Sequence, residues 1–208
     1  MSDQHHLWSG RFADSPDEDV FQFQASFPFD RKLFEDDIEG SIAWAEALEA
    51  AGVLSSKDSS SIVVALNDIR KNGRRDPGFI SGNDEDIHAF IERQLIQRLG
   101  DVARRLHTGR SRNEQVSLDL RLYLRRRIPK IQKALVKLVQ SLARQASDAG
   151  DVLMPAYTHL RRAQPVLAAH FFLAHVSALK RDHSRLSEAL KETDALPLGS
   201  GAIAGTSY

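Results

Sequence analysis

The sequence predicts an all-α fold, in which a small amino-terminal helical domain precedes the start of a long central helical bundle. Apolar residues recur at three- and four-residue spacings through most of the chain, which is the periodicity of amphipathic helices. No segment shows the sustained alternation of a half-buried strand. We assign residues 1–106 to an amino-terminal arm and helical domain, and residues 107–208 to the first part of the bundle.

The amino-terminal domain opens with an aromatic and acidic stretch, residues 1–30, which lacks clean periodicity and is predicted to be an extended arm. Ser55 with Asp58 resembles a capping box, which marks the start of a helix. Acidic residues follow Asn83 and basic residues come later in the same segment, as the helix dipole favours. Three helices are therefore predicted, over about residues 30–51, 55–73 and 83–100, with a glycine-rich loop at 72–83.

The bundle part contains two predicted long helices. Pro129 interrupts the first of them and predicts a kink near Arg125. We expect the second to begin near Pro165, because proline is favoured in the first turn of a helix. Residues 196–208 are rich in Gly and Ser and show no helical pattern. The stripe that predicts the first helix consists of Leu120, Leu124, Ile128, Ile131, Leu135, Leu138 and Leu142.

Composition excludes several classes of partner. Lys plus Arg and Asp plus Glu number 28 each, so the formal net charge of zero gives no electrostatic basis for binding nucleic acid or a membrane surface. The absence of cysteine excludes disulfides and thiolate metal sites and favours a reducing compartment. No signal-peptide pattern is present, and no apolar run approaches the ~20 residues that span a bilayer. We expect a cytoplasmic protein that binds neither nucleic acid nor membrane.

The first polar cluster, residues 107–113 (HTGRSRN), lies just before the first long helix. It places two guanidiniums, two hydroxyls, an imidazole and an amide around a glycine. Backbone N–H groups at a helix start and arginine side chains together suit a carboxylate. A capped helix start with solvated arginines explains the same residues equally well, so the chemistry alone leaves both interpretations open.

Two further clusters each contain a histidine. In residues 154–165, His159 has a hydroxyl and an amide nearby in sequence and would titrate near neutral pH. Taken singly, a hydrogen-bonded structural histidine is the stronger interpretation. The run Asp84–His88 (DEDIH) has metal-ligating residue types, but no other ligand set accompanies it, so helix capping is preferred there. We find no phosphate-binding glycine loop, nucleophile elbow or zinc spacing.

Taken together, these clusters resemble the argininosuccinate lyase family. Residues 107–115 (HTGRSRNEQ) resemble the family signature, which usually ends in Asp-Gln, and residues 154–165 (MPAYTHLRRAQP) resemble its MPGYTHLQRAQP stretch. Residues 196–208 (LPLGSGAIAGTSY) resemble the family segment that follows the next bundle helix. Residues 8–12 (WSGRF) and 84–88 match its amino-terminal pattern and its acidic helix start. The five matches occur in the family's order over essentially all 208 residues.

The resemblance implies the all-α fumarase/aspartase-like fold and a homotetramer whose active sites are shared between subunits. The implied reaction eliminates fumarate from argininosuccinate to give arginine, in arginine biosynthesis or the urea cycle, with no metal and no organic cofactor. His159 matches the histidine that carries an acid–base role, while Ser26 and Asp30 match positions at the substrate's amino-acid end. The implied substrate-binding residues are Ser26, Asp30, Asp86, His88, Ser111, Arg112, Asn113 and Thr158.

Several positions depart from the family pattern. Arg161 stands where the family has Gln, and a second charge beside His159 would alter that histidine or the substrate contacts. Ala156 and Ala169 replace usual glycines, and Glu114 replaces Asp. These changes affect the expected efficiency more than the family assignment.

Length is the larger departure, because the family is more than twice as long as this chain. Its flexible Ser-Ser-x-Met-Pro-x-Lys-x-Asn-Pro loop, which carries the proton-abstracting serine, has no match here. The remainder of the bundle and the carboxyl-terminal domain are likewise expected to be missing. We therefore expect the chain to be the first half of a lyase and inactive alone. The alternative is a non-catalytic or complementing subunit of a lyase-like helical assembly.

Overall fold

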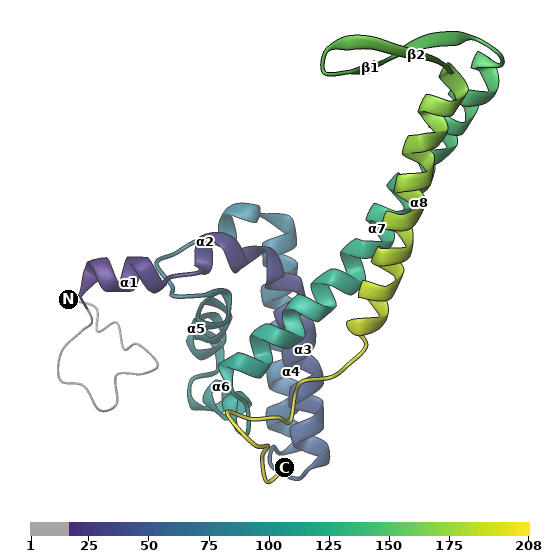
Figure 1. Cartoon of the computed structure of the whole chain (residues 1–208). Helices are drawn as coiled ribbons and strands as arrows, with labels where there is room; N and C mark the ends of the chain where they lie inside the picture. The colour runs from purple at the N-terminus through teal and green to yellow at the C-terminus, as the bar shows by residue number, and fades with distance from the viewer. Residues whose placement is uncertain (1–16) are drawn as a thin grey trace. The chain divides into compact units, whose positions relative to one another are not determined.

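The structure is a computed structural model of the chain, and it describes residues 17–208 (Figure 1). These residues fall into two compact units, of which the first comprises residues 17–120 and 196–208 and the second residues 121–195. Helices dominate both units, so the all-α prediction is confirmed, with one two-stranded hairpin added. The proposed domain boundary after residue 106 stays a prediction. No helix of the described part of the chain is both long and apolar enough to cross a membrane.

The first unit contains the predicted amino-terminal helices. Those expected over residues 30–51, 55–73 and 83–100 correspond to α3, α4 and α5, and the Ser55 side chain accepts the Asp58 N–H as a capping box requires. The unit's elements are α1 (Glu18–Gln24), α2 (Phe27–Asp30), the 3₁₀ turn η2 (Arg31–Leu33), α3 (Phe34–Ala50), α4 (Ser56–Arg75), η3 (Pro77–Phe79), α5 (Ile87–Leu99), α6 (Asp101–Arg104), η4 (Arg105–His107) and the start of α7 (Arg112–Ala149).

The extended arm predicted over residues 1–30 is wrong for its described part, while residues 1–16, including the 8–12 match, lie outside the described residues. Helices α1 and α2 occupy this stretch. Asp17 begins α1, because its side chain accepts the backbone N–H groups of Asp19 and Val20. The sequence pattern missed these helices because four to seven residues are too few to show helical periodicity.

The core of the first unit is centred on Phe90 of α5, which is fully buried. Its ring centroid lies 5.6 Å from that of Phe27, 6.4 Å from Phe34 and 5.7 Å from Phe79. Aromatic pairs at such distances add to the free energy of apolar burial. This aromatic cluster fixes the first turns of α5 against α2 and α3, and those turns carry the candidate site.

The second unit is a helical hairpin made of the rest of α7 and of α8 (Ala168–Glu192). The two helices run antiparallel (Figure 1), and Gln132 of α7 donates a hydrogen bond to Ser187 of α8 at 2.9 Å. Helix α7 continues through Pro129. Large apolar side chains of both helices are exposed within the unit, among them Ile131, Val136, Leu138, Phe171 and Leu173.

A β-hairpin connects the two long helices, formed by β1 (Leu153–Thr158) and β2 (Arg161–Leu167). The expected helix start near Pro165 is therefore wrong, because Pro165 pairs with Pro155 across the hairpin and α8 begins at Ala168. Neither face of this ribbon is buried, so the alternation that predicts a strand never arises in its sequence. The non-helical prediction for residues 196–208 is confirmed, since they form turns.

Candidate active site

Two segments far apart in the sequence meet at the amino terminus of α5. The backbone N–H groups of Ser26 and Phe27 both donate to the carbonyl of Glu85, at 2.8 and 3.1 Å. Asp30 accepts the Ile87 N–H at 3.0 Å through one carboxylate oxygen and the Ser26 hydroxyl at 2.6 Å through the other. Burial raises the pKa of Asp30, although these hydrogen bonds oppose the rise. The predicted residues Ser26 and Asp30 are thus held beside the first turn of α5.

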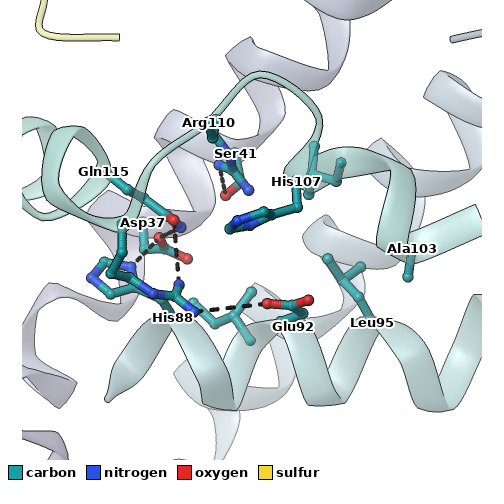
Figure 2. A pocket seen from close by; sticks show the side chains of 12 residues that line it. Asp37, Ser41, His88, Glu92, Leu95, Ala103, His107, Arg110 and Gln115 are labelled. Carbon is teal, nitrogen blue, oxygen red and sulfur yellow. Dashed lines mark hydrogen bonds and ion pairs between the residues drawn. The ribbon is translucent and has the colours of Figure 1, made fainter. Parts of the chain in front are cut away.

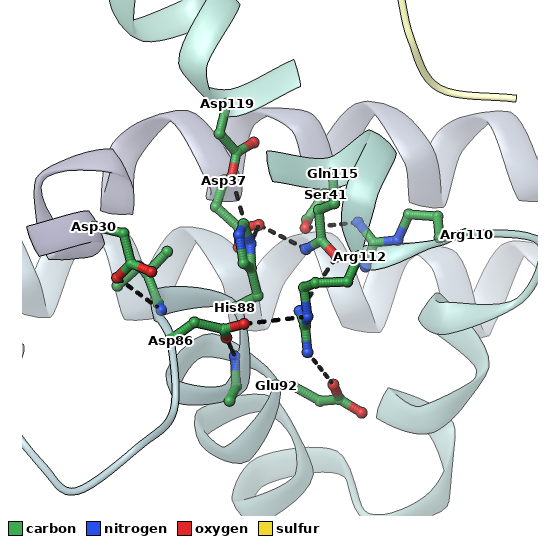
Figure 3. Close-up of polar contacts among 12 residues, drawn as sticks. Asp30, Asp37, Ser41, Asp86, His88, Glu92, Arg110, Arg112, Gln115 and Asp119 are labelled. Atoms are coloured by element: carbon green, nitrogen blue, oxygen red, sulfur yellow. Dashed lines mark hydrogen bonds and ion pairs between the residues drawn. The ribbon is translucent and has the colours of Figure 1, made fainter. Parts of the chain in front are cut away.

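The same helix start carries Asp86, which is the amino-terminal cap of α5. One oxygen of its carboxylate accepts the Ala89 N–H at 2.6 Å, as helix capping predicts. The other lies 3.4 Å from Nε of Arg112, and Nη2 of Arg112 lies 3.8 Å from Glu92 Oε2 (Figure 3). The Arg112 guanidinium is therefore held between two carboxylates of α5. Its side chain is only 15% exposed, so the solvated-arginine interpretation is wrong for this residue.

Ser111, Asn113 and Glu114 form the capped start of α7. The Ser111 N–H donates to Glu114 Oε1 at 2.8 Å, and the Asn113 N–H donates to the Ser111 hydroxyl at 3.4 Å, which is a reciprocal capping box. The second oxygen of Glu114 accepts the N–H groups of Gly199 and Gly201 at 3.0 and 2.8 Å. Glu114 thereby joins two of the family-like segments, the one before α7 and the one at residues 196–208.

His88, in the first turn of α5, belongs to a buried cluster with Asp37 of α3 and Asp119 of α7. Its Nδ1 is 2.7 Å from Asp37 Oδ1 and 3.4 Å from Asp119 Oδ2 (Figure 3). The same Asp37 oxygen accepts a hydrogen bond from the Gln115 amide at 2.7 Å. The imidazole is 1% exposed, so His88 lies in the interior of the first unit.

The two carboxyl groups of this cluster have opposite pKa shifts. Burial raises the pKa of Asp119 to about 10, and the negative charge of Asp37 adds to the rise. Burial also opposes ionisation of Asp37, but His88 and Arg110 outweigh it and lower the pKa of that carboxyl to about 2. Asp37 therefore ionises more readily than Asp119.

A cavity of about 20 Å³ lies between α5 and the segment before α7, with Ser41, Glu92, His107 and Arg110 among its lining residues (Figure 2). Arg110 turns into it and donates to the Ser41 hydroxyl at 3.0 Å. Burial lowers the pKa of His107, and Arg110 with Arg112 lowers it further. This volume holds about one water molecule. The cavity, which Arg112 also lines, is therefore too small to admit a substrate.

Thr158 and His159 belong to the second unit, whereas every other predicted site residue belongs to the first. His159 and Leu160 form the two-residue turn of the hairpin, with φ of 50° and 60°. Two-residue hairpin turns of this kind require positive φ at both central residues, which is unfavourable for residues with a Cβ. Both residues are exposed, which leaves the imidazole open to a partner.

Comparison with known proteins shows the family of the chain. The sequence model of the lyase family, described as "Lyase", matches residues 10–208. The chain belongs to the lyase family. An argininosuccinate lyase of Roseiflexus castenholzii is 47% identical over 200 residues, which make up 96% of this chain and 44% of that protein. The chain thus spans less than half the length of this curated lyase.

Solved structures of lyases share the fold. The crystal structure of EDDS lyase in complex with formate superposes with a TM-score of 0.72 at 24% identity, over 94% of this chain and 39% of that one. A fumarate lyase from Mesorhizobium sp. BNC1 superposes with a TM-score of 0.66 at 20% identity, over 92% of this chain and 44% of that one. The predicted helical lyase fold is confirmed.

The lyase motifs did not reveal every residue of the site. Glu92, Asp37 and Asp119 lie outside the segments on which the resemblance rests, yet each faces a predicted residue. A signal existed for Asp37, because it falls three and four residues after Phe34 and Leu33 on the apolar stripe of α3. A carboxylate on such a stripe is buried and needs a polar partner. Glu92 and Asp119 had no comparable signal.

Proposed function

We propose that this chain forms the amino-terminal part of an argininosuccinate lyase, which eliminates fumarate from argininosuccinate to leave arginine. One observation carries the proposal beyond the family: Arg112 lies between Asp86 and Glu92, and the start of α5 that carries Asp86 also holds the hydrogen-bonded pair of Ser26 and Asp30. The 47% identity to an argininosuccinate lyase supports the same substrate. No metal or organic cofactor is required for this elimination.

The charges around Arg112 suit a substrate that carries both signs. Argininosuccinate has three carboxylates, an amine and a guanidinium. Arg112 is the cation suited to one carboxylate, with the polar groups of Ser111 and Asn113 beside it. The carboxylates of Asp30 and Asp86 suit the ammonium or guanidinium end. A simple dicarboxylate would offer these acidic groups no cation.

The elimination needs a base, an acid and an anion-binding group. A base removes the proton beside a succinate carboxylate, the electron pair forms the double bond of fumarate, and the bond to the guanidino nitrogen breaks. Arg112 stabilises the negative charge that develops on the carboxylate. We assign acid–base work at the leaving nitrogen to His159 and a hydrogen bond to the substrate to Thr158. The carbon proton is assigned to a serine outside these 208 residues.

His88 receives a supporting part in this proposal. Its imidazole is buried and hydrogen-bonded to Asp37, so it orients the start of α5 and thereby Asp86. The ring is 1% exposed, so direct contact with the substrate would require the start of α5 to open.

We further propose that the complete lyase is a homotetramer in the cytoplasm, with each active site built from several subunits. The exposed apolar side chains of α7 and α8 support assembly, because apolar surfaces of this extent mark protein interfaces. Assembly also explains why Thr158 and His159 stand on an exposed hairpin: the residues they serve are those of another copy.

The proposal is tested by fusing residues 1–208 to the carboxyl-terminal remainder of the Roseiflexus relative and following fumarate by its ultraviolet absorbance. We expect the fusion to be active and residues 1–208 alone to be inactive. Arg112→Ala should lower kcat/KM roughly a hundredfold or more, and Arg112→Lys should restore little of it because lysine lacks the bidentate fork. The exposed Arg75→Ala variant is the control.

Three results would count against this function. Activity of residues 1–208 alone would contradict the need for an external serine. A folded, tetrameric fusion that releases no fumarate would favour a non-catalytic subunit. Equal losses in the Arg112 and Arg75 variants would remove Arg112 from the site.

A further inference from the structure

The cluster of Asp37, His88 and Asp119 contains more polar atoms than its hydrogen bonds satisfy. Asp119 is fully buried and Asp37 is 1% exposed. Over residues 17–208, neither oxygen of Asp119 has a hydrogen-bond partner, and Oδ2 of Asp37 has none either. An ionised carboxylate in such a position costs several kcal/mol unless it is paired. The unpartnered oxygens, both of Asp119 and Oδ2 of the adjacent Asp37, therefore need an explanation.

Close packing of α7 on α3 brings these groups together. A Cβ atom on Gly40 would lie 2.8 Å from Leu118 Cδ2 and 3.6 Å from Asp119 Oδ1, so a larger residue there would force the Leu118 side chain to move. The ligand-type atoms of Asp37, His88 and Asp119 all lie within 4.8 Å of one another. The arrangement is part of the helix packing and does not depend on a mobile side chain.

One proton between the two carboxyl groups would satisfy both. His88 is already committed to Asp37 at 2.7 Å and is more distant from Asp119 at 3.4 Å. If Asp119 carries the proton, its O–H can donate to the partnerless oxygen of Asp37. The result is a continuous chain of hydrogen bonds from α7 through α3 to α5.

The surrounding charges favour the protonated form. The groups that face Asp119 are Asp36 and Asp37 of α3, His88 of α5 and Arg110 of the segment before α7. Arg110 is balanced by ionised Asp37, so a second ionised carboxylate would leave excess negative charge in the interior. A cation could also neutralise that charge, but the nearby Arg110 guanidinium and the two donors on Asp37 Oδ1 oppose one.

We propose that Asp119 is a positioning residue of the lyase site, holding a proton that it donates to Asp37 so that Asp37 fixes His88 and the start of α5. Asp86 and Ile87, whose N–H binds Asp30, immediately precede His88 in the chain. The protonation rests on the geometry of the cluster alone. The effect on the site rests on the proposed lyase function.

The test compares Asp119→Asn with Asp119→Ala, because an amide can donate to Asp37 as a protonated carboxyl does, whereas a methyl group cannot. Unfolding is followed from about pH 6 to about pH 9 on the fusion protein. The folded wild type keeps a proton that its unfolded chain loses above about pH 4. The folding equilibrium constant of the wild type should therefore fall by up to about tenfold for each unit of rising pH, relative to that of Asp119→Asn. We expect Asp119→Ala to be less stable than both throughout the range.

Infrared spectroscopy provides an independent measurement. The carbonyl band of a protonated carboxyl group should persist in the wild type at neutral pH and disappear in Asp119→Asn. Parallel stability profiles, together with no such band, would overturn the proposal. So would an Asp119→Asn variant as unstable as Asp119→Ala, since that would mean an ionised carboxylate paired with His88. Stabilisation by added Mg²⁺ or Zn²⁺ that is absent in Asp119→Asn would identify a cation site instead.

Fumarate release separates this inference from the proposed function. Asp119→Ala should raise KM for argininosuccinate by at least about tenfold more than Asp119→Asn does, because only alanine breaks the chain to Asp86. If the wild-type fusion is inactive while the pH and infrared results hold, the lyase assignment fails and the shared proton stands. If the fusion is active and Asp119→Ala changes neither KM nor stability, the positioning role fails.

Discussion

At the scale of single residues, the site depends on carboxylates that bind protein groups rather than solvent. Glu114 accepts three backbone N–H groups, from Ser111, Gly199 and Gly201, and is 3% exposed. A carboxylate with three donors is strongly stabilised in its ionised form and fixes the segments that supply them. The family usually has Asp at this position, and the longer Glu side chain reaches all three of these N–H groups with its two oxygens.

Glu114 gives the residue-scale prediction. Glu114→Ala should lower the free energy of unfolding by about 3 kcal/mol, because hydrogen bonds to a buried charged group contribute about 1.5–3 kcal/mol. Urea unfolding measures this loss, and hydrogen exchange should show faster exchange at Gly199 and Gly201. Glu188→Ala is the matched control, since Glu188 pairs only with Lys191 on the exposed face of α8. Equal effects of the two substitutions would refute the prediction.

The grouping of several predicted residues could be anticipated from the sequence, whereas their role in substrate binding stays a prediction. The resemblance selected Ser26, Asp30 and Asp86, and the structure brings all three to the start of α5. It could not show that His88 faces inward, because burial depends on how α3 and α7 cross. Asp119 lies about two turns into α7, outside every recognisable motif, and its proximity to Asp37 depends on the packing at Gly40.

At the scale of elements, the helices follow the sequence pattern and the hairpin does not. The capping box at Ser55 and the cap at Asp86 start α4 and α5 where local chemistry requires. The strands β1 and β2 bury no face within the second unit, so neither period two nor period 3.6 is imposed on their sequence. Such a ribbon is marginal by itself and needs packing from elsewhere.

The hairpin turn gives the element-scale prediction. Leu160 has a φ of 60° and is 99% exposed, so Leu160→Gly should relieve left-handed strain of about 1 kcal/mol and stabilise the hairpin. Slower proteolysis at residues 153–167 would reveal the effect. Tyr157→Gly, within β1, is the control and should have the opposite effect, because glycine weakens a strand. Faster cleavage of Leu160→Gly would contradict the assigned turn.

At the scale of the whole molecule, an apolar stripe without an internal partner has to be covered. Ile131 and Leu138 are about half exposed on α7, as are Phe171 and Leu173 on α8. The sequence predicted the α7 stripe but not what covers it, because periodicity identifies an apolar face and leaves its partner open. The proposed tetramer would bury these faces against other copies of the same helices.

Leu138 tests that assembly. Leu138→Lys places a charge in the proposed interface, and an unpaired buried charge costs several kcal/mol, so the fusion protein should dissociate to smaller species. Sedimentation velocity measures the oligomeric state, and circular dichroism confirms that α7 stays helical. Gln140→Lys adds the same charge two residues further along α7, at an exposed position, and should leave the assembly intact. A Leu138→Lys variant that remains tetrameric would place the interface on another face of α7, and the shared active site would then require a different set of neighbours for His159.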